Sequence, residues 1–223
     1  MAYLRTLALG AILAFAGFFA PANAASSEPL QWSSPQKRIL LVEPDVQLGE
    51  LTVGGVIEPR ADWSDRAAHA IESSLGSALS KRGIDVNTLA TLTDPHEVQL
   101  AKLHAVVGME ILIHQMGFSK LPTKTSALDW TLGPGATDFR TKYGADYAMF
   151  VFLRDSYSSG SRKAMMFLGM ANGGSQGAFA TLVDLRTGNV VWFKQHFTAG
   201  GGDLRTETGA DEFTADLLAD FPQ

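Results

Sequence analysis

The chain has 223 residues, with 23 acidic and 18 basic side chains and a formal net charge of −5. Its basic residues are few and spread along the sequence, which excludes nucleic acid as a partner, because nucleic-acid binding requires a clustered basic face. The absence of cysteine excludes disulfides, thiolate nucleophiles and zinc–thiolate sites, so a hydrophobic core must hold the fold without covalent help.

The first 24 residues have the pattern of a secretory signal peptide. Arg5 gives the positive start, Leu7–Ala20 is the apolar region, and Ala22–Ala24 has the small-x-small pattern of a cleavage site. The apolar run is shorter than the roughly 20 residues of a membrane span, which disfavours the alternative of an uncleaved anchor. No cysteine follows the cut, so we expect no lipid anchor. The sequence therefore predicts a periplasmic protein of a bacterium, exported and cleaved after Ala24.

After the signal peptide we predict a flexible leader over residues 25–37, which are rich in Ser, Pro and Gln, and then a single domain over residues 38–223. No internal repeat divides this domain. It opens with an apolar strand, Ile39–Val42, which Pro44 ends because proline cannot donate to a ladder of hydrogen bonds. Residues 45–60 are predicted to be an irregular extended segment or a second short strand.

Two long helices are predicted next, with a strand over residues 84–89 between them. The first helix is capped by Asp62 and ends before Gly83. The second has the start signal Asp94-Pro95. It carries two apolar stripes, one formed by Val98, Ala101, Ala105, Met109 and Leu112, the other by Leu100, Leu103, Val107 and Ile111. A helix that is apolar on two sides is buried between layers or contacts a partner.

The C-terminal part is predicted to consist mainly of strands. A helical stretch, Gly133–Gly144, leads into the apolar run 147–153, which is typical of a central strand. Residues 155–162 are predicted to form a polar turn, and the next apolar residues are ambiguous between strand and helix. A β-hairpin over residues 178–197 and a short helix over residues 207–221 follow. The predicted fold class is therefore α/β: a single domain with a mixed sheet, helices packed on it, a C-terminal β-hairpin and a short final helix.

Three of these segments together resemble a known group of proteins. They are the opening strand with its capped helix, Tyr143–Tyr147 (Tyr-Gly-Ala-Asp-Tyr) and Thr181–Trp192 with Thr-Gly at its turn. They resemble envelope proteins of the curli secretion channel (CsgG-like) type and the N-terminal domain of the Tol translocation protein. The resemblance implies an α/β sheet covered by helices, and an accessory or assembly role in the cell envelope rather than catalysis. Many of those relatives are lipoproteins, whereas this chain lacks the cysteine.

One motif indicates a hydrolase instead. Gly173–Gly177 matches G-x-S-x-G with Ser175 at its centre, and Asp184 and His196 follow in the order of an α/β-hydrolase. A nucleophile elbow needs a helix directly after the serine, but the next residues are predicted to be a strand. We keep a periplasmic serine- or carboxylate-dependent hydrolase as the alternative function. Its carboxylates would be Asp45, Asp155 and Asp184. The simpler interpretation is that these carboxylates cap turns and pair with Arg154 or Arg186.

The candidate binding residues are Asp155, Tyr157 and Arg162, which lie in a serine-rich segment suited to adaptable recognition, and Gln176 in the glycine-rich loop. The simpler interpretation of the serine-rich segment is a plain turn.

We expect no metal site and no cofactor. Three histidines, His96, His104 and His114, share one predicted helix, but at 100° per residue they point in different directions and do not converge.

The sequence therefore predicts an exported periplasmic or envelope accessory protein that acts as a binding or assembly module without catalysis. Its partner would be another envelope protein, or a second copy in a homo-oligomer. The hypothesised contact is the second helical stripe, with Tyr157 and Arg162 selecting the partner, unless segment 118–140 of the same chain covers that stripe.

Overall fold

The computed structural model describes residues 32, 37–117, 119–124, 127–199 and 201–222. The predicted signal peptide, its cleavage site and most of the predicted leader lie outside the described residues. Trp32 and Lys37 are the described residues of the leader. Trp32 packs edge-on against Tyr147, with ring centroids 5.2 Å apart, so this part of the leader contacts the domain.

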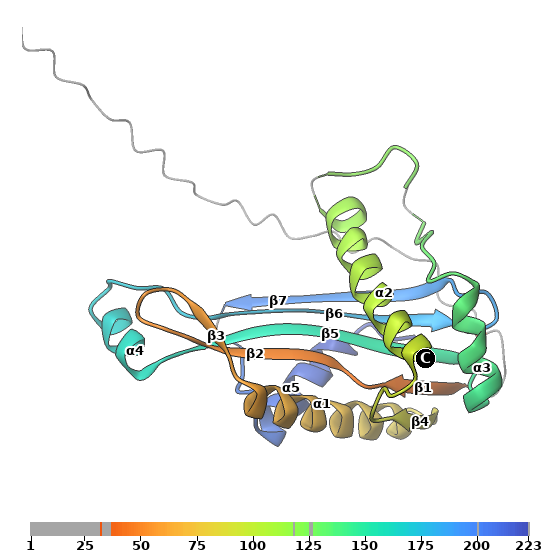
Figure 1. Cartoon of the computed structure of the whole chain (residues 1–223), viewed down its shortest axis with the longest axis horizontal. Coiled ribbons are helices and arrows are strands. Elements are labelled where there is room, and N and C mark those ends of the chain that lie inside the picture. Colours follow the sequence, from red (N-terminus) through yellow and green to blue (C-terminus); the bar gives the residue numbers. More distant parts are fainter. Residues whose placement is uncertain (1–31, 33–36, 118, 125–126, 200, 223) are drawn as a thin grey trace, which may run out of the picture.

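The domain is built on one seven-stranded mixed sheet (Figure 1). This confirms the predicted α/β class, including the C-terminal hairpin and the short final helix. The strands are β1 (Arg38–Val42), β2 (Asp45–Leu51), β3 (Ile57–Pro59), β4 (Asp85–Leu89), β5 (Tyr147–Ser158), β6 (Ser175–Asp184) and β7 (Val190–Ala199).

The long strand β5 is the centre of the sheet. Strands β1 and β2 run parallel to it along the same edge, β1 beside its first half and β2 beside its second half. Pro44 separates these two strands, as expected for a residue without a backbone N–H. Strand β6 runs antiparallel along the other edge of β5, and β7 pairs with β6 to form the outer edge. Strands β4 and β3 extend the sheet beside β1 and β2.

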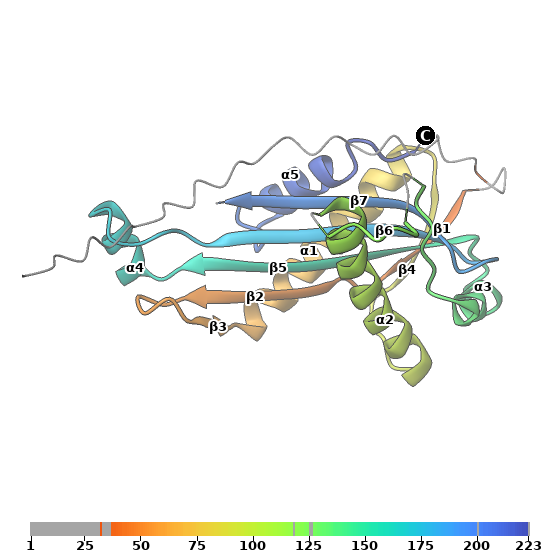
Figure 2. The same ribbon diagram turned by 90° about the horizontal axis from the view of Figure 1, so that it is seen from above.

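Helices cover both faces of the sheet, as Figures 1 and 2 show. The helices are α1 (Ala61–Lys81), α2 (Pro95–Ile111), α3 (Thr137–Tyr143), α4 (Gly160–Phe167) and α5 (Glu207–Leu217), with a π-helical turn, Leu112–Met116, after α2 and a 3₁₀ turn, Pro134–Ala136, before α3. Helices α1 and α5 lie on one face, α2 lies on the other, and α4 lies at the far end of the sheet. In the described part of the chain, no helix is both long and apolar enough to cross a membrane.

The core consequently has two layers. On one side, Ile71, Leu75 and Leu79 of α1 pack with the side chains of β5 that face them, such as Met149. Spaced four residues apart, these helical residues form a single buried stripe. On the other side, α2 packs on the face of the sheet that carries Phe150.

Of the two helix N-caps predicted from the sequence, one is confirmed and the other is wrong. Asp94 caps α2 as expected, because its carboxylate accepts the N–H of His96 at 2.9 Å. The predicted cap of α1 is wrong: Arg60 occupies that position without a side-chain cap bond. The chain enters α1 directly from β3, where the Arg60 N–H bonds to Leu48 O. Asp62 therefore lies within the first turn and bonds to Arg66 instead.

The predicted polar turn over residues 155–162 is also wrong in its first half. Strand β5 continues to Ser158, because β2 pairs with it over its whole second half. The turn is short, and α4 begins after Ser159, whose hydroxyl accepts the N–H of Arg162 at 3.2 Å. The ambiguous apolar segment after residue 162 is thus largely helical.

The second predicted stripe of α2 is not free to meet a partner as a whole. Leu100 and Ile111 are buried in the core of the same chain, where Leu128, Trp130 and Leu132 of the following segment also pack. The buried face of α2 includes Glu97 and His104. Leu103 of the same stripe is exposed, as are Val106 and Met109 of α2 and Ile113 of the π-helical turn after it.

Candidate functional site

The four sequence-predicted site residues lie at one end of the sheet. Asp155 and Tyr157 lie near the C-terminal end of β5, Gln176 lies at the start of β6, and Arg162 lies on α4. They come together there because β5 and β6 are antiparallel and place Asp155 opposite Gln176. This end, which also carries the β2–β3 turn, is the candidate site.

Asp155 and Gln176 are interior residues joined in a chain of polar contacts. Asp155 is 8% exposed and Gln176 is 3% exposed. The Gln176 side-chain nitrogen donates to Asp155 Oδ2 at 3.0 Å, and its Oε1 lies 2.9 Å from His196 Nε2. His196 Nδ1 in turn lies 2.6 Å from Asp216 Oδ2. These contacts link β5, β6, β7 and α5, so they fix the end of the sheet.

Tyr157 is held just as firmly. Its hydroxyl accepts the N–H of Leu204 at 2.9 Å, and its ring meets Trp63 edge-on, 6.0 Å away. The guanidinium of Arg205 lies over both rings, 4.3 Å from that of Trp63 and 4.5 Å from that of Tyr157. Burial raises the pKa of the Tyr157 phenol, and the charge of Asp155 raises it further. The phenol therefore stays protonated, and its hydrogen bond and ring contacts fix the surrounding segments. Tyr157 lines an open groove of about 930 Å³.

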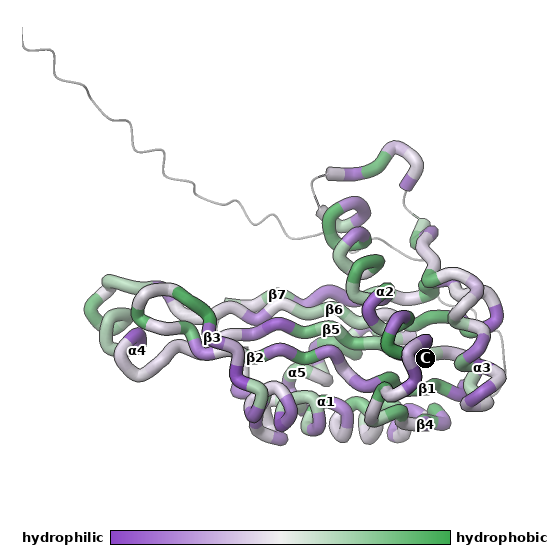
Figure 3. The backbone as a smooth tube through the Cα atoms, viewed as in Figure 1, coloured by the Kyte–Doolittle hydropathy of each residue, from purple (hydrophilic) through white to green (hydrophobic). Residues whose placement is uncertain are grey.

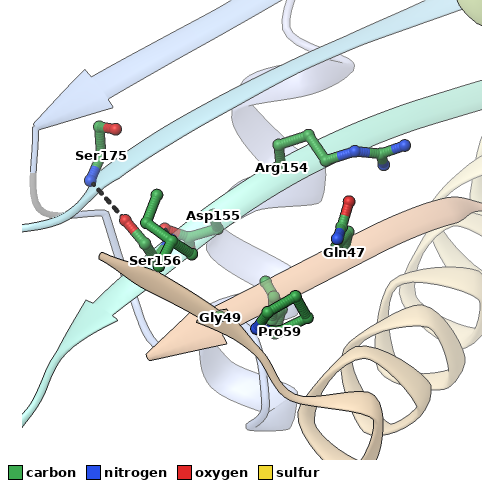
Figure 4. Close-up of a pocket in the computed structure, with 9 residues that line it drawn as sticks. Gln47, Gly49, Pro59, Arg154, Asp155, Ser156 and Ser175 are labelled. Carbon is green, nitrogen blue, oxygen red and sulfur yellow. Dashed lines mark hydrogen bonds between the residues drawn. The ribbon is translucent and has the colours of Figure 1, made fainter. Parts of the chain in front are cut away.

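A second, smaller pocket of about 310 Å³ lies on the opposite face, where β2, β3, β5 and β6 meet (Figure 4). Its walls include Gln47 and Gly49 of β2, Arg154 of β5 and Ser175 of β6. A Cβ on Gly49 would lie 2.4 Å from Ile57 Cγ2 and 3.0 Å from the carbonyl oxygen of Glu58. A larger residue at position 49 would therefore have to displace part of β3.

The glycine-rich loop before β6 has a structural explanation. A Cβ on Gly174 would lie 1.7 Å from the carbonyl oxygen of Ser156, so only glycine allows this approach. The N–H of Ser175 donates to Ser156 Oγ at 3.3 Å (Figure 4). The loop therefore packs directly on the end of β5.

Arg162 ties the surrounding segments together. Its Nη1 donates to Thr52 O at 3.0 Å, and its Nε donates to Asn172 O at 2.9 Å. A single guanidinium thus joins α4, the β2–β3 turn and the glycine-rich loop, since one planar group can satisfy several carbonyl oxygens. Arg162 fixes two loops relative to each other.

The β2–β3 turn and α4 carry the most exposed apolar surface of the described chain, which we call the apolar tip. It consists of Val53 and Val56 from the β2–β3 turn, Ile57 from the start of β3, and Met166, Phe167, Leu168 and Met170 from α4 and the turn after it. Phe167 is 91% exposed, Met170 66% and Leu168 65%. In Figure 3 both segments carry green stretches at the same end of the molecule. More than half of the exposed large apolar side chains of the described residues lie here.

The serine, aspartate and histidine of the hydrolase motif do not come together. Ser175 and Asp184 are the two ends of β6. His196 lies opposite Ala178 in the β6–β7 register, so it shares a face of the sheet with Gln176, its hydrogen-bond partner, and not with Ser175. No nucleophile–base–acid constellation is formed by these three residues.

Two of the three strand-end carboxylates, Asp45 and Asp184, pair with arginines, as the simpler interpretation of the sequence expects, whereas Asp155 does not. Asp45 lies 2.8 Å from Arg154, and Asp184 lies 2.8 Å from Arg186. Neither is adjacent to Asp155, which bonds to Gln176.

The three helical histidines have separate surroundings. His104 is buried and stacks on a phenylalanine, whereas His96 and His114 each lie near a different carboxylate. Among the described residues, no group of His, Asp and Glu side chains is arranged to hold a metal ion.

Sequence reasoning missed the apolar tip itself. The available signal was apolar residues at turns: Val53 and Val56 flank Gly54-Gly55, and Met165–Leu168 directly precedes Gly169. Turns are normally polar because they lie on the surface, so large apolar residues beside paired glycines indicate a surface with a contact function.

No known protein family matches the chain, and no curated protein is similar to it in sequence. It is similar to several solved structures. One is the PelC dodecamer of Paraburkholderia phytofirmans, at 14% identity and a TM-score of 0.42, covering 85% of this chain and 92% of that one. Another is the lipoprotein GNA1162 of Neisseria meningitidis, at 13% identity and a TM-score of 0.36, covering 82% and 94%. A third is the C-terminal domain of LpoB of Escherichia coli, at 13% identity and a TM-score of 0.30, covering 75% and 87%. The curli secretion and Tol types expected from the sequence are not among these three.

Proposed function

We propose that the protein is an exported, non-catalytic binding or assembly module of the bacterial envelope, and that it makes its contact through the apolar tip. The observation that carries this proposal is the gathering of seven exposed large apolar side chains from two separate loops at one end of the sheet. Contiguous exposed apolar patches are unusual on soluble proteins and mark contact surfaces. A role of the curli secretion or Tol type belongs to the same proposal.

The tip is built to keep its shape. Arg162, on α4, bonds to the β2–β3 turn at Thr52 O, and the polar chain through Asp155 and Gln176 fixes the ends of β5 and β6 beside them. We assign these residues, together with Tyr157, a positioning role in binding. Direct contact with the partner falls to the exposed residues, Phe167 above all.

A preorganised surface binds more tightly than a flexible one, because less conformational entropy is lost on association. The rigid support of the tip therefore favours a binding function. The net charge of −5 argues against nucleic acid as the partner. The partner is an envelope component or a second copy of the chain.

Site-specific photo-crosslinking in living cells tests the contact surface. Benzoyl-phenylalanine placed at Phe167 is expected to give an adduct, to protein or to lipid, that the same probe at Val106 does not give. Val106 is the matched control because it is 58% exposed but lies on α2. The adduct should disappear when Leu168→Asp is added, since a charge at the tip opposes apolar contact.

The hydrolase alternative is tested in parallel with a fluorophosphonate probe and a panel of ester substrates. Because Ser175 has neither His196 nor Asp184 beside it, we expect no labelling that depends on Ser175, as compared with Ser175→Ala. Turnover of an ester that Ser175→Ala abolishes, together with the absence of any adduct from Phe167, would overturn the proposal.

A further inference from the structure

The shape of the apolar tip narrows the choice of partner. Figures 1 and 2 show α4 and the β2–β3 turn at the far end of the sheet, away from α2 on one face and from α5 on the other. The tip is therefore a projection. Met166 also lines the open groove and Ile57 the smaller pocket, but Phe167 and Leu168, which are more exposed, line neither. A protein partner would need a cavity shaped to receive it, whereas the boundary between lipid head groups and acyl chains accepts an apolar projection of any shape.

The size of the tip is a second argument. It consists of seven large apolar side chains, whereas a stable protein–protein interface takes roughly 20–30 residues from each side. Two tips in contact with each other would thus form far too small an interface for a stable dimer. Insertion into a bilayer has no such minimum, because each apolar side chain that leaves water contributes independently.

The charges around the tip fit the same partner. Arg162 and Lys163 lie in the first turn of α4, directly before its exposed apolar residues. Lys163 forms no ion pair with any described residue. A lysine beside an apolar surface can keep its ammonium group among lipid phosphates while its stem follows the apolar side chains. Glu58, next to Ile57 in β3, is an acidic residue close to the tip, and it limits the attraction to anionic head groups.

We infer that the apolar tip inserts into the surface of a phospholipid bilayer, with Phe167 and Leu168 reaching the acyl-chain boundary and Lys163 at the level of the head groups. This inference rests on the proposed function and specifies the partner of that same surface. Because the chain is acidic overall, burial of apolar side chains drives the insertion, and charge contributes little. Binding should accordingly change only slightly with salt, unlike the binding of a polybasic segment.

The first experiment measures co-flotation of the purified protein with vesicles of phosphatidylethanolamine and phosphatidylglycerol. The wild type is expected to float with the vesicles at both low and high salt. Phe167→Asp with Leu168→Asp should reduce the bound fraction about tenfold or more, since two charges would have to enter the apolar boundary. Leu103→Asp with Val106→Asp is the matched control on α2 and should bind as the wild type does.

The second experiment reads the depth of insertion directly. The chain has no cysteine, so Leu168→Cys and Val106→Cys each give a single position for an environment-sensitive fluorophore. On addition of vesicles the label at Leu168 should brighten and shift to shorter wavelength, and the label at Val106 should not. Both sites are well exposed, which keeps the labelled variants folded.

The outcomes separate this inference from the proposed function. Loss of flotation in the tip variant alone, with a fluorescence change at Leu168 alone, supports insertion. Equal flotation of tip variant, control and wild type overturns it. A protein adduct from Phe167 in cells, with no binding to vesicles, also overturns it but leaves the proposed function standing.

Discussion

The part of the sheet under α2 and the apolar tip both contain large apolar side chains, which are buried in the first region and exposed in the second. Phe179, under α2, is 1% exposed, whereas Phe167, at the tip, is 91% exposed. An apolar side chain stabilises a fold only where folding removes it from water. The covered region therefore carries the stability of the domain, and the tip keeps large apolar residues that contribute almost nothing to it.

The packing under α2 shows how close that cover is. The ring of Phe179 stacks on Phe152 on one side, with centroids 4.8 Å apart, and on Phe193 on the other, at 5.6 Å. Helix α2 approaches this row at Gly108, where a Cβ would lie 2.0 Å from Phe179 Cε2. Nothing of this kind covers Phe167. Each prediction below changes one side of this contrast.

The largest effect is expected from truncating a covered phenylalanine. Phe179→Ala should lower the free energy of unfolding by about 3–5 kcal/mol, because it removes buried surface and leaves a cavity among rings that cannot collapse. Phe167→Ala should change it by less than about 0.5 kcal/mol. Urea denaturation of both variants measures the difference. Similar losses in the two variants would mean that the tip is part of the core.

The next prediction concerns His104, which is 2% exposed and stacks on Phe150 under α2. Burial lowers the pKa of His104 to about 3, whereas an unfolded histidine has a pKa near 6.5. Between these values the unfolded chain binds a proton that the folded chain does not, so stability falls as pH falls. His104 alone contributes a slope of up to about 1.4 kcal/mol per pH unit below pH 6.5.

His104→Leu should remove that slope and leave the contribution of the carboxylates. The measurement is urea denaturation of wild type and variant at pH 7.5, 6 and 5. We expect the difference in stability between the two proteins to shift in favour of the variant as the pH is lowered. A constant difference across this range would show that His104 is not a buried neutral group.

These two regions also differ in how well the sequence predicts them. The strand at 147–153, the helix end at Gly83 and the Asp94-Pro95 start were all predicted, because each depends on local pattern and local backbone chemistry. The full length of β5 was not, because its polar residue Asp155 is buried through a bond from Gln176, twenty-one positions away. When a polar residue is buried because it bonds to a residue far away in the sequence, the local hydropathy pattern does not reveal it.

The buried face of α2 was predicted only in part, for a similar reason. Leu100 and Ile111 lie in the core, but so does Glu97, whose carboxylate accepts bonds from Lys142 and Tyr143 next to the end of α3. Burial alone would raise the pKa of Glu97, but those bonds hold it below its usual value. A helix can therefore turn a glutamate inward when another element supplies the donors.

The four candidate residues chosen from the sequence lie at the end of the sheet that carries the apolar tip, but the sequence analysis did not identify the tip itself. The sequence shows that residues 165–168 are apolar, yet apolarity does not tell whether another element covers them. That depends on where the helices of both layers end, which is a property of the assembled fold. Arg162 was selected as a recognition residue, and the structure places its guanidinium among carbonyl oxygens of the same chain.

The smallest effect is expected from two glycines that both lie within helices. Gly76 of α1 has nothing within 4 Å of the position that a Cβ would take, so Gly76→Ala should stabilise the protein by about 0.5–1 kcal/mol through its higher helix propensity. Gly108→Ala gains the same propensity, but its methyl group would meet the ring of Phe179, which two stacked neighbours hold in place. Overpacking of a well-filled core costs about 1–3 kcal/mol, so the net effect should be a loss.

If α2 lies as close to the row of phenylalanine rings as in the structure, the two glycine variants should change the free energy of unfolding in opposite directions. Thermal or urea denaturation measures both changes. Gly108→Ala combined with Phe179→Leu provides the control, because the smaller side chain makes room for the methyl group, and the two changes should then cost less together than the sum of their separate effects. Simple additivity, or a stabilising Gly108→Ala, would mean that α2 lies further from the sheet. The region under α2 would then be less tightly covered, and closer in character to the tip, than the exposures of Phe179 and Phe167 indicate.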